Sequence, residues 1–192
     1  MSLSNVKARD MASLLHPFTN LTRLRETGPT VIAGGRGVFV HDADGKDYLE
    51  AMSGLWCTAL GWGEEELAET AAAQMRTLSF GHIFGGKSHE PGIALAEGLV
   101  DHLGAPARVF FCNSGTEANE VAFKMTRLTG KTKIVAAQGA FHGRTMGSLA
   151  LTGQPDKQAP FEPLPGEITH VPYGDTKALA AAVDSTTAAV FL

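Results

Sequence analysis

The fold of this chain is best predicted from one segment, Val109-Phe110-Phe111-Cys112-Asn113-Ser114-Gly115-Thr116-Glu117-Ala118-Asn119-Glu120. An apolar run of strand-forming residues ends at Asn113, and a helical pattern begins after the small residues that follow it. A helix N-terminus leaves backbone N–H groups without partners and carries partial positive charge, so this turn suits a phosphate dianion. Glycine at position 115 would let the backbone approach such a ligand closely.

The same turn also has an explanation that needs no ligand. Ser114 followed three positions later by Glu117 is a capping box, in which two side chains satisfy the first amides of the helix. Such boxes are common at helix starts, so the turn by itself leaves both explanations open. The two roles are compatible in one turn.

Strand and helix patterns alternate from this stretch to the end of the chain. Apolar runs predict strands over 108–112, 133–137, 168–171 and 188–192. Helical patterns predict helices over 115–128, from 144, and over 176–183. The first of these helices carries apolar residues on one side, at Val121, Ala122, Met125 and Leu128. The alternation predicts an α/β fold, in which a mostly parallel sheet has helices on both faces.

The residues before this region predict a smaller, antiparallel element. Asp44-Gly45 lies between two alternating runs and is typical of a hairpin turn. The glycines at 34, 35 and 37 precede a strand and not a helix, so they do not form a dinucleotide-binding loop. A short helix is expected within residues 1–15. We expect an N-terminal arm and this small sheet segment over 1–63.

Two further helices are predicted between the small sheet and residues 109–120. The first spans 64–78, begins with acidic residues, and has apolar residues at helical spacing: Leu67, Ala71, Met75 and Leu78. The second spans 91–103 and has Pro91 in its first turn. We expect the larger domain to run from 64 to 192.

Composition narrows the classes of function. The chain has 192 residues, a formal net charge of −4 and a pI near 6.0, which give no electrostatic reason to expect a nucleic acid partner. The first fifteen residues do not form a convincing signal peptide, and no stretch is apolar enough to span a bilayer, so we expect a cytoplasmic protein. Cys57 and Cys112 lack metal-ligand spacing and lie in apolar contexts, so we expect two buried thiols, no disulfide and no metal site.

Two motifs at a distance from each other carry a resemblance to a known family. Residues 114–120, followed by Phe141-His142-Gly143-Arg144-Thr145, resemble the cofactor domain of the class III aminotransferases, which are pyridoxal phosphate (PLP) enzymes of fold type I. Leu55-Trp56-Cys57 and Phe84-Gly85-Gly86 resemble the ω-amino acid:pyruvate transaminase branch, whereas 141–156 is more similar to the acetylornithine and ornithine branch. The resemblance runs from about residue 17 to residue 192.

The resemblance implies a set of cofactor-binding residues. Ser114, Gly115 and Thr116 would hold the phosphate, most directly through the backbone of Gly115 and Thr116. Phe141 would stack on the pyridine ring, which keeps water from one face of the ring. Without its neighbours, this phenylalanine would be read as a core residue. His142 would have a secondary role in orienting the cofactor or moving protons, although a lone histidine at a turn is more often structural.

The resemblance also implies substrate-binding residues, and these give mixed signals. Phe18, Trp56, Phe84 and Gly85 suggest an aromatic pocket that accepts an ω-amine, although Trp56 is equally compatible with a core position. Phe84 and Gly85 would face the active site of the neighbouring subunit in a homodimer. Arg144 instead suggests an amino acid substrate, because a guanidinium binds a carboxylate bidentately.

Transamination needs a Schiff-base lysine and an acidic partner for the pyridine nitrogen. In the resembled family both residues lie beyond Leu192, and no lysine of this chain matches the family context, so no catalytic residue is assigned here. The chain stops within the apolar run Val190-Phe191-Leu192, and we expect it to be the first part of a longer protein.

The expected activity is the transfer of an amino group from an amine or an ω- or α-amino acid to a keto acid, by a homodimer or with a second chain that supplies the C-terminal half. Two alternatives remain at this point. One is a PLP aminomutase or decarboxylase on the same scaffold. The other is a non-catalytic folding or dimerisation fragment, either truncated or engineered.

Overall fold

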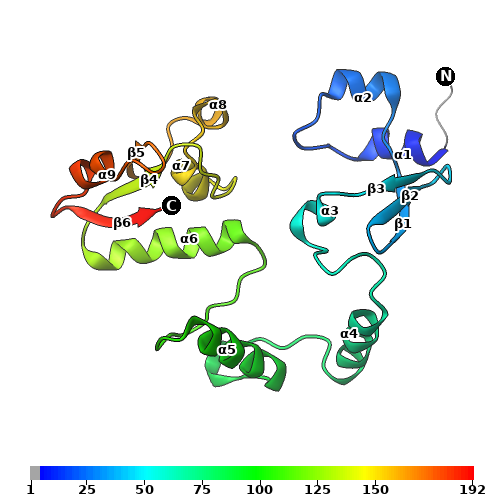
Figure 1. Cartoon of the computed structure of the whole chain (residues 1–192), viewed down its shortest axis with the longest axis horizontal. Helices are drawn as coiled ribbons and strands as arrows, with labels where there is room; N and C mark the ends of the chain where they lie inside the picture. The colour runs from blue at the N-terminus through cyan, green and yellow to red at the C-terminus, as the bar shows by residue number, and fades with distance from the viewer. Residues whose placement is uncertain (1–4) are drawn as a thin grey trace. The chain divides into compact units, whose positions relative to one another are not determined.

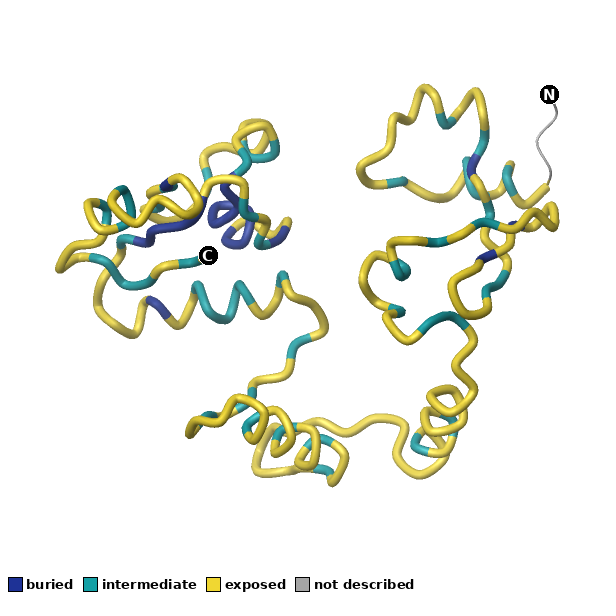
Figure 2. Tube along the Cα trace, viewed as in Figure 1, coloured by how far each residue is buried: buried dark blue, intermediate teal, exposed yellow. Residues whose placement is uncertain are grey.

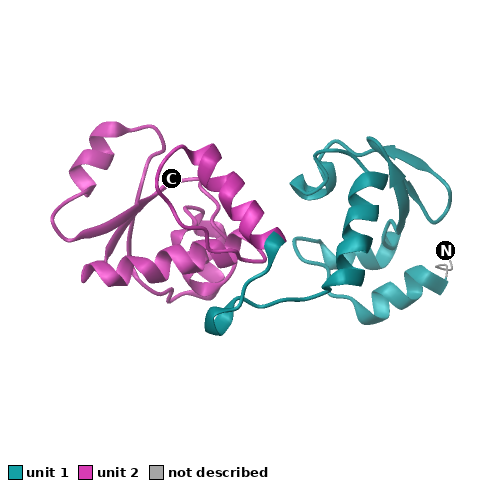
Figure 3. Cartoon of the chain, turned by 90° about the horizontal axis from the view of Figure 1, so that it is seen from below, with its two compact units in different colours: residues 1–90 teal, residues 91–192 magenta. Residues whose placement is uncertain are grey.

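The computed structural model describes residues 5–192 and divides into two compact units, residues 1–90 and 91–192, which are described separately (Figures 1 and 3). The first expected helix is α1, Asn5–Ser13, and the part of that expectation within residues 1–4 lies outside the described residues. The division by contacts falls after Glu90, whereas the expected domain boundary at 63/64 remains a prediction about the whole protein.

The first unit contains the expected antiparallel sheet. Strands β1 (Ile32–Arg36), β2 (Phe39–Asp42) and β3 (Asp47–Leu49) pair in the order β1-β2-β3. Asp42 closes the turn at Asp44-Gly45, because its carboxylate accepts the N–H groups of Asp44 and Lys46 at 3.0 and 2.9 Å and the Tyr48 hydroxyl at 2.7 Å. The hydrogen bonds from these donors, that from Tyr48 most of all, lower the pKa of Asp42. The antiparallel pairing of β2 with β3 confirms the predicted hairpin.

The other elements of the first unit are α2 (Leu21–Thr27), α3 (Ser53–Trp56), α4 (Glu65–Thr77) and the 3₁₀ turn η1 (Phe84–Gly86). Helix α4 confirms the predicted helix over 64–78. Its apolar residues Leu67 and Met75 are nevertheless exposed, so the face that the periodicity predicts to be buried has no cover among the described residues.

Four consecutive residues of α3, from Ser53 to Trp56, have positive φ values of 50, 58, 61 and 66°. They form one left-handed turn, closed by bonds of 2.8 Å from the N–H of Trp56 to the oxygen of Met52 and from the N–H of Cys57 to that of Ser53. The Glu50 carboxylate accepts the N–H groups of Met52 and Gly54 at 3.1 and 2.7 Å. This turn is strained, because left-handed backbone is unfavourable for residues with a Cβ.

The second unit is built on a parallel sheet. Its strands β4 (Lys133–Ala137), β5 (Glu167–Val171) and β6 (Thr187–Phe191) pair in the order β5-β4-β6. The predicted helices are present as α5 (Glu90–Leu103), α6 (Gly115–Thr126), α7 (Met146–Leu151) and α9 (Thr176–Ala182). Helix α8 (Pro155–Gln158) and the turns η2 (Arg127–Thr129) and η3 (Ala159–Phe161) complete the unit.

The core of the second unit lies around β4 and α7, which are the dark segments in Figure 2. Ile134, Val135, Ala136 and Ala137 are all at most 1% exposed. Because successive strand residues point to opposite faces, both faces of the central strand are covered. The structure therefore confirms an α/β unit with a mostly parallel sheet.

Three expectations from the sequence are wrong in this structure. Residues 108–112 form no strand, because no described segment pairs with them and a strand exists only through its ladder of hydrogen bonds. Met125 and Leu128 of the α6 region are exposed and do not face a core. Cys57 is also exposed; it and the half-buried Cys112 are free thiols.

Candidate functional site

The first turn of α6 combines a capping box with unused amides. The Ser114 hydroxyl accepts the N–H of Glu117 at 3.1 Å, and the Glu117 carboxylate accepts the N–H of Asn113 at 2.7 Å. Among the described residues no acceptor is found for the N–H groups of Gly115 and Thr116. A Cβ added at Gly115 would meet no atom within 4 Å apart from its chain neighbours and the nearby backbone of its own helix, so the space beside Gly115 is open. The capping box therefore leaves two amides of the first turn without a partner among the described residues.

The loop between β4 and α7 lies directly against this turn. A Cβ added at Gly143 would come within 2.6 Å of the Thr116 hydroxyl and 2.7 Å of the Ser148 Cβ. The side-chain amide of Asn119 donates to the oxygen of His142 at 2.7 Å. The second predicted motif is thus brought to the N-terminal half of α6, although the two are far apart in sequence.

Helix α7 holds the loop from its other side. The Ser148 hydroxyl, which is fully buried, donates to the oxygen of Thr116 at 2.9 Å. The buried Thr152 hydroxyl accepts the N–H of His142 at 3.0 Å and donates toward the oxygens of Ser148 and Gly143 at 3.0 and 3.3 Å. These buried hydroxyls fix the backbone of the loop on both sides of Gly143.

Phe141 belongs to the same loop and directly precedes His142. It is 51% exposed, which excludes the alternative of a buried core phenylalanine in the described chain. The Lys157 ammonium lies 5.8 Å from the centre of its ring, and the same ammonium donates to the side-chain oxygen of Gln154. A planar ligand has access to this ring.

His142 is turned inward from the same loop. Its ring meets that of Phe191 edge to face at 5.9 Å, and its buried Nε2 atom has no hydrogen-bond partner among the described residues. Burial, together with the charge of His170, lowers the pKa of His142. The buried Nε2 and the contact with Phe191 favour the structural role for this side chain over direct cofactor contact, and the assignment to the cofactor stays a prediction.

Arg144 is exposed on the loop, immediately before Thr145, the N-cap residue of α7. The structure places it on the same loop as Phe141 and His142. Five predicted residues of the second unit thus gather around one turn together with Arg144, at the N-terminus of α6 and on the loop before α7.

The four remaining predicted residues belong to the first unit. Phe18, Trp56 and Phe84 are 74, 77 and 79% exposed, and Gly85 is exposed with φ of 64°. The exposure of Trp56 excludes a core position within the described chain. Phe84 lies near the ring of His82, with centroids 6.0 Å apart.

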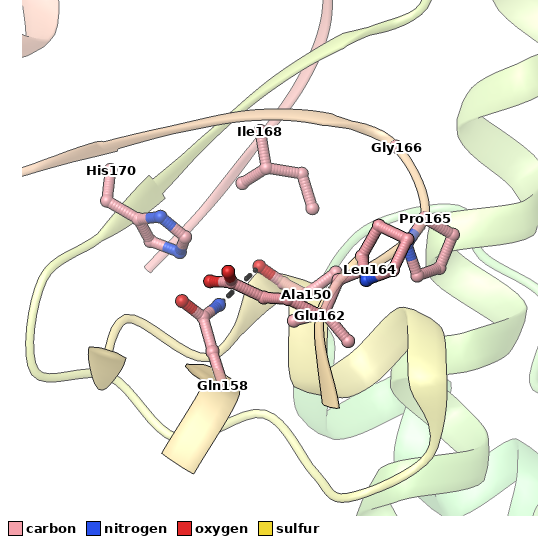
Figure 4. A pocket seen from close by; sticks show the side chains of 9 residues that line it. Ala150, Gln158, Glu162, Leu164, Pro165, Gly166, Ile168 and His170 are labelled. Carbon is pink, nitrogen blue, oxygen red and sulfur yellow. Dashed lines mark hydrogen bonds between the residues drawn. The ribbon is translucent and has the colours of Figure 1, made fainter. Parts of the chain in front are cut away.

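A separate pocket of about 610 Å³ lies between β5 and α7 of the second unit (Figure 4). It is lined by Ile168 and His170 of the strand and by Gln158, Glu162 and Leu164. The Gln158 amide donates to the oxygens of Leu149 and Ala150 at 3.0 and 3.1 Å, which shapes its floor. None of the predicted site residues lines this pocket, so the pocket and the predicted site are different places in the second unit.

Sequence reasoning missed the residues that hold the site together, namely Asn119, Glu120, Ser148 and Thr152. Their partners lie up to 32 positions away along the chain, so no local spacing reveals them. The one available signal is the polar pair Asn119-Glu120 inside a helix whose first turn is already capped.

Residues 5–192 contain no group of three or more His, Cys, Asp or Glu side chains placed to hold a metal ion. No helix among them is both long and apolar enough to cross a membrane.

The second unit is thus an α/β unit in which the loop between β4 and α7 packs against the N-terminal half of α6. Comparison with known proteins makes this class specific. The model of the family described as aminotransferase class-III matches residues 23–190, and the chain belongs to this family.

Relatives and solved structures agree with this assignment. The acetylornithine aminotransferase of Mycolicibacterium smegmatis is 64% identical over 166 residues, which cover 86% of this chain and 42% of that protein. The omega transaminase of Pseudomonas jessenii, solved in complex with PMP, is 41% identical with a TM-score of 0.81, over 88% of this chain and 40% of that one. A thermostable omega transaminase variant engineered for asymmetric synthesis of enantiopure bulky amines gives 39% identity and a TM-score of 0.81, with the same coverage. The chain therefore spans about two fifths of the length of the relatives it matches.

Proposed function

We propose that the chain is the N-terminal part of a PLP-dependent aminotransferase that moves an amino group from an amine or amino acid to a keto acid. The observation that supports this most directly is the pair of N–H groups at Gly115 and Thr116 without a partner among the described residues, on a helix against which the loop of Phe141 packs. The open space at Gly115 matches what a phosphate dianion requires. The residues present therefore fit the cofactor that the family implies.

Each residue then has a defined task. The N–H groups of Gly115 and Thr116 bind the phosphate, and the dipole of the twelve-residue α6 favours its charge. Phe141 covers one face of the cofactor ring and keeps water from it. Gly143 lets the loop approach Thr116, which a side chain would prevent. PLP, when bound, supplies the aldehyde that receives the amino group and the ring that accepts electrons.

The remaining chemistry lies outside these residues. The lysine and the acidic partner of the ring nitrogen are proposed to belong to the part of the protein that this chain does not span. We also propose that the complete protein is a cytoplasmic homodimer, in which Phe84 and Gly85 face the neighbouring site.

Substrate choice is proposed to depend on Arg144 and the aromatic residues. The similarity to relatives named acetylornithine aminotransferase supports a carboxylate-bearing amino acid as the substrate. Arg144 would bind the carboxylate of such a substrate bidentately. The omega transaminase variant engineered for bulky amines carries substitutions at a tryptophan and a phenylalanine 28 positions apart, the same separation as between Trp56 and Phe84. This match supports a role for both aromatic residues at the substrate mouth.

The first experiment measures binding of PLP to the purified chain by absorbance and fluorescence. The wild-type chain is expected to bind PLP in competition with inorganic phosphate. Gly115→Val should remove this binding while leaving circular dichroism and the unfolding midpoint nearly unchanged, because a side chain there meets no protein atom. Equal losses of fold and binding would support a turn that only caps the helix.

A second measurement tests the missing chemistry. Borohydride treatment of the PLP-loaded chain, followed by intact mass and peptide mapping, should show no lysine specifically modified. Specific modification of one lysine would mean that a competent amine lies within these residues, and the proposal for the remaining part would be wrong.

A further inference from the structure

Glu120 extends from the second turn of α6 to the start of α7. Its Oε1 atom accepts the N–H of Ser148 at 2.9 Å and also the hydroxyl of Thr145. Both donors are at the beginning of a different helix, 25 and 28 positions away along the chain. Hydrogen bonds to an ionised carboxylate are charge-assisted and stronger than those between neutral groups.

The start of α7 depends on this carboxylate. Thr145 is the N-cap residue of α7, but its hydroxyl makes no capping bond within its own helix and donates to Glu120. Glu120 therefore replaces the local cap with one supplied by α6, and it places negative charge where the dipole of α7 favours it.

The fit around the carboxylate is close. A Cβ added at Gly147 would lie 2.5 Å from Oε2 of Glu120 and 3.0 Å from its Cδ. Real Cβ atoms do not approach other atoms this closely, so a side chain at 147 would push the Glu120 carboxylate out of its present position.

Two consecutive residues of α6 thus hold opposite ends of the loop that carries Phe141 and Arg144. Asn119 binds the oxygen of His142 near one end, and Glu120 binds Thr145 and Ser148 at the other. We infer that Glu120 is a positioning residue, which fixes the loop so that Phe141 lies over the cofactor whose phosphate occupies the α6 N-terminus. This inference rests on the proposed function.

A purely structural carboxylate would affect every property of the second unit alike. A positioning residue has a narrower effect, because the loop contributes the aromatic ring and not the phosphate seat. Removal of the Glu120 carboxylate should therefore weaken the binding of PLP and leave the binding of inorganic phosphate unchanged, because the proposed phosphate contacts lie in the first turn of α6.

The experiment compares three variants of the full chain. Glu120→Ala is expected to weaken PLP about tenfold, the loss that corresponds to one charge-assisted hydrogen bond, and to leave the dissociation constant of inorganic phosphate within about twofold. Glu120→Gln keeps an oxygen that accepts both donors, and it should retain PLP binding within about threefold of wild type. Gly147→Ala should weaken PLP in the same way as Glu120→Ala, because its Cβ displaces the carboxylate.

The double variant Glu120→Ala/Gly147→Ala completes a double-mutant cycle with the two single variants. Removal of the carboxylate also removes the collision at position 147, so the double variant should bind PLP no more weakly than either single variant. Losses that add in the double variant, or a Glu120→Ala chain with wild-type PLP affinity, would overturn the inference. Equal weakening of PLP and phosphate would reduce Glu120 to a general stabiliser.

The two proposals fail separately. A wild-type chain that binds inorganic phosphate without PLP, or binds neither, contradicts the proposed function before Glu120 is tested. A wild-type chain that binds PLP while Glu120→Ala binds it equally well contradicts only the role of Glu120.

Discussion

The side-chain amide of Asn119 donates a 2.7 Å hydrogen bond to the main-chain oxygen of His142, 23 positions further along the chain. The bond joins the helix that follows one predicted motif to the loop that forms the other. It brings the two sequence motifs next to each other in the fold.

Asn119→Ala should therefore lower the free energy of unfolding of the second unit. The half-buried oxygen of His142 would lose its donor, and one such bond contributes about 1 kcal/mol. Urea unfolding followed by circular dichroism measures the change. Lys124→Ala on an exposed position of the same helix is the matched control and should change stability by less than about 0.5 kcal/mol.

Gly143→Ala should be strongly destabilising, and Gly115→Ala should not. At Gly143 a Cβ would collide with Thr116 and Ser148, and φ of 142° already disfavours a side chain. We expect a cost of about 1–3 kcal/mol from overpacking and strain. Gly115→Ala is the control, because it enters open space in a helix and alanine is the better helix former. Similar unfolding midpoints for both variants would contradict the close approach of the loop to α6.

Thr152→Val keeps the shape of the side chain and removes a hydroxyl that serves three backbone groups. The N–H of His142 and the oxygen of Gly143 would lose their partner in a fully buried position. An unsatisfied buried polar group costs about 1–3 kcal/mol, so the melting temperature should fall by several degrees. Thr186→Val, at an exposed position, provides the comparison. A variant as stable as wild type would show that this hydroxyl is dispensable.

His142 should make stability depend on pH below its ordinary pKa of 6.5. Burial lowers the pKa of this imidazole in the folded chain, so the unfolded chain binds more protons between the lowered value and 6.5. Stability is then complete above pH 6.5 and is lost as pH falls through the lowered pKa. His142→Asn should remove this part of the pH dependence in urea titrations between pH 5 and 7.5. A slope in that range that is unchanged by the substitution would assign the effect to another group.

Much of the second unit could be predicted from sequence, because its signals are local. The period of the apolar residues predicts β4, β5, β6 and the helices between them, and Ser114 with Glu117 predicts the start of α6. The hairpin turn at Asp44-Gly45 follows from residue types alone. Membership of the aminotransferase family was also predicted, from two motifs.

The remaining features depend on partners that local sequence does not specify. Residues 108–112 have the composition of a strand, but pairing requires a neighbouring strand, and none of the described segments supplies one. Met125 and Leu128 have the spacing of a buried face, yet burial requires a covering element. The ties from Asn119, Ser148 and Thr152 are absent from any local pattern, because each joins segments that only the fold brings together.

The left-handed turn from Ser53 to Trp56 gives protein engineers a place to add stability. Three of its four residues carry a Cβ in a conformation that costs about 1–2 kcal/mol each, so Leu55→Gly or Leu55→Asn would relieve strain without removing a buried contact. Such variants would tolerate further mutations better. Glycine at 55 would also widen the range of backbone angles open to the turn, so the exposed Trp56 would sample more orientations.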